Sequence, residues 1–151
     1  MRLLSRILPA ANVMLELSVT SKKRVFEQAG LLFENQHGLE RAAVYESLFA
    51  RERLGSTGLG AGIAVPHGRV KGLKHSVAAF FRLTHPIAFE APDRQPVKQL
   101  LFLLAPEDAA QQHLDILAEV AQLFSDEAFR LKLADQTDSG VVHRLLTTGS
   151  V

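Results

Sequence analysis

A glycine-rich stretch that ends in a histidine is the part of the sequence best suited to chemistry. Residues 55–68 read GSTGLGAGIAVPHG, with four glycines before a short apolar run that stops at Pro66, His67 and Gly68. Proline fixes its own φ and keeps the preceding residue extended, so we expect His67 at the stiff end of a buried strand over residues 63–65. Because Gly68 has no side chain to crowd the imidazole, His67 is placed to meet another molecule. The alternative is an ordinary surface or core-edge histidine.

Two nucleotide-binding motifs do not fit this stretch. The segment GLGAG at residues 58–62 lacks the final spacing of a dinucleotide fingerprint, and a strand-like run with a proline follows it instead of a helix. A Walker A loop requires Gly-Lys followed by Ser or Thr, which the stretch does not contain. The glycines therefore either serve the histidine or form a plain loop.

Two further side chains stand where an apolar residue is expected. Arg51 follows Val44 and Leu48 at helical spacing, so it shares a helix face with them. It can stabilise the helix C-terminus with its stem on the core, or direct its guanidinium at an anion beside the glycine-rich stretch. His113 begins an apolar helical stripe, a position where a histidine is usually a hydrogen-bonded core residue.

The elements that would position these side chains alternate between strands and helices. Residues 100–104, LLFLL, are typical of a central strand covered on both faces, although periodicity alone does not exclude a helical segment. The pattern predicts an α/β layered domain with helices on both sides of its sheet. We expect strands at 13–17, 63–65, 77–83, 87–89 and 97–104, a polar connection at 69–75, and helices at 22–34, 39–53, 107–124, 126–135 (capped by Ser125) and from Thr137 or Asp138 onward.

Composition excludes several classes of protein. The 151 residues suffice for one domain with a full core, and the net charge of +1 gives no electrostatic case for binding nucleic acid or a membrane surface. Cysteine is absent, which removes disulfides and thiolate chemistry, and the six histidines are too scattered for a metal cluster. Without an apolar leader or a stretch of about 20 apolar residues, the sequence predicts a cytoplasmic protein without membrane insertion.

The sequence resembles phosphotransferase-system enzyme IIA domains of the fructose/mannitol type. Glu52, six residues, and then LGAGIAVPHG at 59–68 match the active-site signature of that family, and the likeness extends over nearly the whole chain. The resemblance implies a single type-2 enzyme IIA domain over residues 1–151, with a mixed β-sheet flanked by helices on both sides. It implies no cofactor, and a transient phosphohistidine without turnover of a free small molecule.

The resemblance also assigns roles to individual residues. His67 matches the phosphorylated histidine, which the family precedent modifies on Nε2, and His113, in QHLDIL, matches a second histidine that assists transfer. Arg51 matches an arginine that lines the site. Transfer needs hydrogen bonds or positive charge around the phosphoryl oxygens, which Arg51 can supply through two parallel bonds, with Ser56 and Thr57 as lesser candidates.

Within that family, the sequence looks most like the nitrogen-related enzyme IIA proteins. The features that carry this likeness are the SKKR start at residues 21–24, the loop at 55–60 and the lack of a permease or IIB segment. They imply a nitrogen-type histidine phosphocarrier protein as phosphoryl donor and regulation of target proteins as output. The alternatives are a sugar-uptake IIA that passes the phosphoryl group to a IIB domain, and a non-catalytic protein-interaction module. A hydrolase is the least favoured alternative, because no serine or carboxylate pair is placed convincingly for it.

Overall fold

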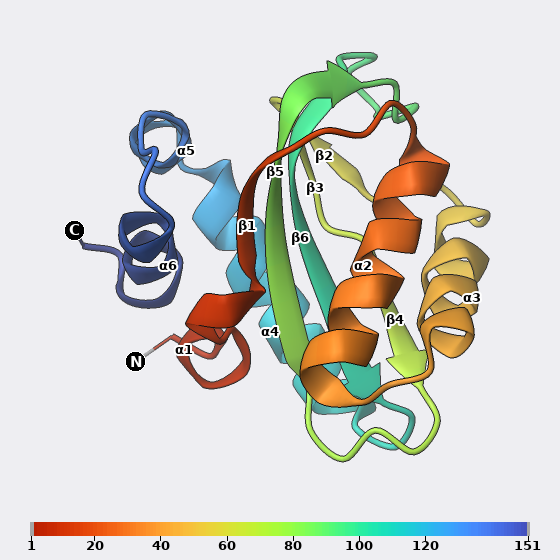
Figure 1. Ribbon diagram of the computed structural model, residues 1–151. Coiled ribbons are helices and arrows are strands. Elements are labelled where there is room, and N and C mark those ends of the chain that lie inside the picture. The colour runs from red at the N-terminus through yellow and green to blue at the C-terminus, as the bar shows by residue number, and fades with distance from the viewer. Residues whose placement is uncertain (1, 151) are drawn as a thin grey trace.

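A six-stranded mixed sheet lies at the centre of the protein (Figure 1). The structure is a computed structural model that describes residues 2–150. The strands run in the order β1-β5-β6-β3-β2, and β4 also pairs with β6. The pairs β1–β5, β3–β6 and β4–β6 are parallel, whereas β5–β6 and β2–β3 are antiparallel. The strands are β1 (Val13–Leu17), β2 (Gly58–Gly60), β3 (Ile63–Ala64), β4 (His67–Val70), β5 (Val77–Ile87) and β6 (Val97–Pro106).

Helices cover both faces of this sheet, which confirms the predicted fold class. In Figure 1, α2 and α3 lie on one side, and α1, α4, α5 and α6 lie on the other. Each side has its own apolar cluster against the sheet. No helix within residues 2–150 has the length and apolar character needed to cross a bilayer. The helices are α1 (Leu4–Ile7), α2 (Lys22–His37), α3 (Arg41–Glu52), α4 (Ala110–Ser125), α5 (Glu127–Ala134) and α6 (Ser139–Thr148), with a 3-10 turn at Ala10–Asn12.

The central strand β6 joins the two apolar clusters. Leu100, Phe102 and Leu104 pack in the cluster beneath α2 and α3. Leu101 and Leu103 pack in the opposite cluster, because successive side chains of a strand point to opposite faces. All five side chains are fully buried, so the expectation of a strand covered from both sides is confirmed.

Local signals set several helix ends. Ser21 caps α2 by accepting a hydrogen bond from the backbone N–H of Arg24, and Gly38 ends the helix at a φ of 69°. Asp138 caps α6. The cap of α5 was expected at Ser125 and is instead Asp126, which accepts from the N–H of Phe129 while Ser125 still belongs to α4.

Two expectations about strands are wrong. The strands predicted at 77–83 and 87–89 are a single strand, β5, which ends at Ile87. A register irregularity after Arg82 lets Ile87 still pair with Val97, and residues 88–89 lie outside the strand. The connection predicted at 69–75 begins only after β4, so His67 starts a strand and does not merely follow one. The short helix α1 was not expected.

Gly68 marks a close contact between α3 and β4. A Cβ at this position would overlap Ser47 Oγ and lie 3.0 Å from the Ser47 carbonyl oxygen. We therefore expect Gly68→Ala to lower the free energy of unfolding by about 1–3 kcal/mol, measured by urea unfolding. The double variant Ser47→Ala, Gly68→Ala should recover part of that loss, because it removes the overlapping hydroxyl. Coincident unfolding curves for Gly68→Ala and the wild type would contradict this contact.

Candidate functional site

The backbone holds the imidazole of His67 in one orientation. His67 is the first residue of β4 and pairs with Leu103 of β6, whose N–H donates to the carbonyl of Pro66 over 3.0 Å. Nδ1 of His67 lies 2.9 Å from the carbonyl oxygen of Val65. A carbonyl only accepts hydrogen bonds, so Nδ1 carries the proton and Nε2 carries the lone pair. The half-buried ring therefore presents Nε2 as its nucleophilic atom.

The surroundings of His67 keep its ring neutral. Burial lowers the pKa of His67 below its usual range, and the positive charge of Arg51 lowers it further. The hydrogen bond to Val65 and the carboxylate of Glu52 act in the opposite direction and raise the pKa, but by less. A neutral imidazole near pH 7 can use its Nε2 lone pair as a nucleophile.

The fold brings His113 next to His67. His113 lies in the first turn of α4, only 8% exposed, and its ring centroid is 5.4 Å from that of His67. The pKa of His113 is lowered to about 4, mainly by burial and to a smaller extent by the nearby His67 and Arg69. Nδ1 of His113 is buried and has no hydrogen-bond partner among residues 2–150, which is unusual for a core histidine.

Arg51 and the glycine-rich stretch form a hollow of about 320 Å³ beside His67. Its lining includes Arg51, Ser56 and Thr57, three of the residues that the sequence indicated. Arg51 donates from one guanidinium nitrogen to the carbonyl of Gly55 over 2.8 Å. A guanidinium has five N–H donors, so the side chain can hold this loop and still bind an anion.

The hydroxyls of Ser56 and Thr57 already have protein partners. Ser56 Oγ donates to the carbonyl of Phe89 over 3.2 Å and accepts from the N–H of Gly58 over 3.1 Å. The Thr57 hydroxyl is buried and donates to Glu52 Oε1 over 2.6 Å. In this arrangement both hydroxyls fix the shape of the loop, so their contact with a phosphoryl group stays a prediction.

Sequence reasoning noted Glu52 as part of the signature but gave it no role. Its carboxylate accepts from the N–H and hydroxyl of Thr57 and from Nζ of Lys22, so it links the loop to the start of α2. The signal in the sequence was an acidic residue next to Arg51 at the end of a helix. What it binds depends on a lysine 30 positions earlier in the chain.

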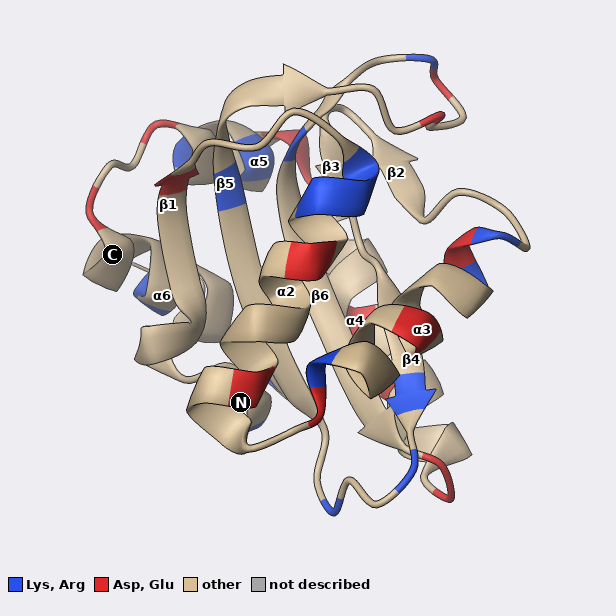
Figure 2. Ribbon diagram, turned by 45° about the vertical axis from the view of Figure 1, so that its right-hand side comes forward, with Lys and Arg blue, Asp and Glu red and all other residues tan. Residues whose placement is uncertain are grey.

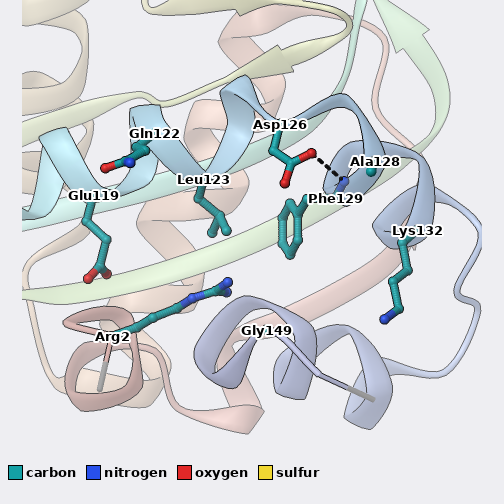
Figure 3. Close-up of a pocket in the computed structure, with 9 residues that line it drawn as sticks. All are labelled: Arg2, Glu119, Gln122, Leu123, Asp126, Ala128, Phe129, Lys132 and Gly149. Carbon is teal, nitrogen blue, oxygen red and sulfur yellow. Dashed lines mark hydrogen bonds between the residues drawn. The ribbon is translucent and has the colours of Figure 1, made fainter.

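A second hollow, of about 450 Å³, lies among α4, α5 and the chain ends (Figure 3). Two of its charged side chains bind the ends of helices. Arg2 donates to the carbonyls of Leu145 and Leu146, and Glu119 accepts from the N–H groups of Leu3 and Leu4. These bonds hold α1 against α4 and α6, so we assign this hollow a structural role. No three His, Cys, Asp or Glu side chains within residues 2–150 gather as metal ligands.

The site thus combines a neutral, half-buried histidine with an arginine-lined hollow. Residues 6–148 match the family model described as phosphoenolpyruvate-dependent sugar phosphotransferase system, EIIA 2. The chain therefore belongs to the EIIA type 2 family, and it is a phosphotransfer component of that system.

Individual relatives refine this assignment. The chain is 39% identical over 140 residues to a nitrogen regulatory protein of Bradyrhizobium diazoefficiens, covering 93% of this chain and 88% of the relative. The crystal structure of nitrogen regulatory protein IIA-Ntr from Neisseria meningitidis superposes with a TM-score of 0.91 at 46% identity, covering 96% of this chain and 99% of that one. A fructose-specific EIIA component of Haloferax volcanii is 32% identical over 107 residues, covering 71% and 70%. The expected resemblance to nitrogen-regulatory enzyme IIA proteins is confirmed.

The lowered pKa of His113 makes stability depend on pH. The unfolded chain takes up a proton on His113 near pH 6.5, whereas the folded protein resists protonation down to about pH 4. The contribution of His113 to the free energy of unfolding is thus fully present above pH 6.5 and falls on acidification. Between pH 7 and pH 5 we expect this side chain to remove about 1–2 kcal/mol from the free energy of unfolding.

Urea unfolding at both pH values, for wild type and His113→Gln, measures this contribution. The variant should lose less stability on acidification than the wild type. His85→Gln, at an exposed position, is the matched control and should behave like the wild type. Equal losses in wild type and His113→Gln would contradict the assignment.

Proposed function

We propose that His67 accepts a phosphoryl group on Nε2 from a nitrogen-type histidine phosphocarrier protein, and that its phosphorylation state regulates partner proteins. The observation that carries this proposal is the bond from Nδ1 of His67 to the carbonyl of Val65, which leaves Nε2 as the nucleophilic nitrogen. In the step, the Nε2 lone pair forms the new P–N bond. The P–N bond of the donor's phosphohistidine breaks, and its electron pair returns to the donor imidazole. Nδ1 of His67 keeps its proton.

Arg51 and His113 support the transfer in different ways. The free N–H groups of Arg51 can hold the equatorial phosphoryl oxygens in the hollow as the group passes between the two proteins. His113 stays neutral, so it adds no charge to the pair of rings and can donate one hydrogen bond toward the phosphoryl group. Ser56 and Thr57 keep the loop in place in this proposal, with their backbone N–H groups and hydroxyls as secondary contacts.

Exposed leucines beside the site suit a protein donor. Residues 2–150 contain four exposed large apolar side chains, of which one lines the hollow and two are adjacent in sequence to residues of the site. Leu59 lines the hollow, Leu54 precedes Gly55, and Leu114 follows His113. We call Leu54, Leu59 and Leu114 the leucine rim. An apolar rim around a polar centre marks a protein-interaction site, and burying it would exclude water from the transfer.

The output that we propose is regulatory. The named relatives include nitrogen regulatory proteins that match most of the chain, among them the one from Bradyrhizobium diazoefficiens. Phosphorylation would add a charge of about −1.5 to −2 at an accessible site on a protein whose net charge is +1. A change of that size can release or attract a partner protein.

A second candidate function is sugar uptake, in which the phosphoryl group passes on to a IIB domain. The similarity to the fructose-specific EIIA component of Haloferax volcanii favours it. Incubating the phosphorylated protein with a purified fructose-type IIB separates the two candidates. Rapid transfer to the IIB domain supports sugar uptake, and a stable phosphoprotein supports the regulator.

The phosphoryl acceptor can be identified by intact mass. After incubation with phosphoenolpyruvate, enzyme I and a histidine phosphocarrier protein, the wild type should gain one acid-labile phosphoryl group. We expect His67→Ala to gain none and His113→Ala to react roughly 100-fold more slowly. His85→Ala, away from the hollow, is the control. A His67→Ala protein that still gains an acid-labile phosphoryl group would contradict the proposal.

The leucine rim should act on donor binding more than on chemistry. Leu59→Glu and Leu114→Glu should each raise KM for the phosphorylated donor about tenfold, because each replaces a buried apolar contact by a desolvated charge, and leave kcat nearly unchanged. Leu131→Glu, at another exposed leucine, on α5, is the matched control and should change neither constant. Equal effects of all three substitutions would rule out a specific rim.

A further inference from the structure

A buried charged cluster lies behind the loop of the His67 site. Figure 2 shows basic residues at the start of α2 and alternating charges where α3 ends. Between these ends, Nζ of Lys22 lies 2.9 Å from Glu52 Oε2. Glu52 is the one acidic side chain among the buried residues of the described chain, with 3% of its side chain exposed. The proposed function assigns no task to this pair.

Interactions within the cluster offset the cost of burying the carboxylate of Glu52. Lys22 neutralises the carboxylate and also rests over the ring of Phe89, with Nζ 4.2 Å from the ring centroid. The N–H and the hydroxyl of Thr57 supply two more donors to Glu52. A buried carboxylate is tolerated only when it is paired and hydrogen-bonded, and Glu52 meets both conditions.

Hydrogen bonds continue from Glu52 to the reacting ring. Glu52 holds the N–H and hydroxyl of Thr57, and the carbonyl of Thr57 accepts from the N–H of Val65 over 3.0 Å. The carbonyl of Val65 in turn accepts from Nδ1 of His67. The orientation of the Val65 peptide thus depends on Thr57, and the tautomer of His67 depends on the Val65 peptide.

We propose that Glu52, neutralised by Lys22, is a positioning residue that fixes the His67 tautomer through Thr57 and Val65. This inference rests on the proposed function for its effect on transfer, but the ordering of the ring is a property of the unmodified protein. The other charged group that acts on His67 is Arg51, which lowers its pKa, while His67 itself lowers the pKa of the neighbouring His113. The carboxylate of Glu52 raises the pKa of His67 and partly offsets Arg51.

The first experiment is NMR on the unphosphorylated protein. In Glu52→Gln we expect amide hydrogen exchange at Thr57 and Val65 to accelerate at least about tenfold, because a charged acceptor is lost. The imidazole ¹⁵N shifts of His67 should move away from the pure Nδ1–H tautomer, and its pKa should fall below that of the wild type. Glu27→Gln removes a carboxylate from the exposed Arg24–Glu27 pair on α2 and is the matched control, with no change expected.

The second experiment measures phosphoryl transfer in the same variants. Glu52→Gln should lower kcat about tenfold with KM for the donor unchanged, because the ring and not the docking surface is disordered. The double variant Lys22→Met, Glu52→Gln should regain stability, since no unpaired charge remains, but not kcat. If Glu52→Gln does not fold, the Thr57→Val variant is measured in its place. We expect smaller changes in the same direction in amide exchange, in the His67 tautomer and in kcat.

The outcomes separate this inference from the proposed function. A folded Glu52→Gln protein with wild-type exchange at Thr57 and a wild-type His67 tautomer overturns the positioning role, whatever the transfer rates. Recovery of kcat in the double variant also overturns it, because Glu52 would then matter for stability alone. A wild type that accepts no phosphoryl group refutes the proposed function, while the NMR measurements still decide whether Glu52 orders the ring.

Discussion

The site depends on the hydrogen bond from Nδ1 of His67 to the carbonyl of Val65, two residues earlier in the chain. An imidazole can react at either nitrogen, and this bond selects one by placing the proton on the other. The contact is possible because Pro66 separates the two residues and β4 begins at His67, where pairing with β6 fixes the backbone. The nucleophile is therefore prepared by the main chain.

The sheet brings the remaining groups to that nucleophile from distant parts of the chain. Strand β6 has apolar side chains on both faces, so helices must pack on both sides of it. One side supplies α3, whose last turn carries Arg51 and Glu52, and the other supplies α4, whose first turn carries His113. The site lies where these layers meet beside β4. Burial there lowers the pKa of both histidines and keeps them neutral.

Much of the fold followed from local patterns, and the errors have physical causes. Helices α2 to α6 and the central strand were predictable because apolar periodicity and capping residues such as Ser21 are local signals. The continuation of β5 past Pro86 was not, because it depends on pairing between Ile87 and Val97. The sequence suggested that the hydroxyls of Ser56 and Thr57 were available to bind a ligand. In the fold, they donate hydrogen bonds to Phe89 and Glu52 instead.

The sequence by itself determined the central sheet with helices on both faces and the family signature that ends at Gly68, because both depend on residue types and their spacing within short segments. The family resemblance added Arg51 and His113 as candidate companions of His67. Tertiary structure alone decided that the ring centroids of His113 and His67 lie 5.4 Å apart, that Nδ1 of His113 has no partner among the described residues, and that Lys22 neutralises a buried Glu52. Such contacts join residues on different layers, and both their geometry and the cost of burying a charge arise only when the layers pack.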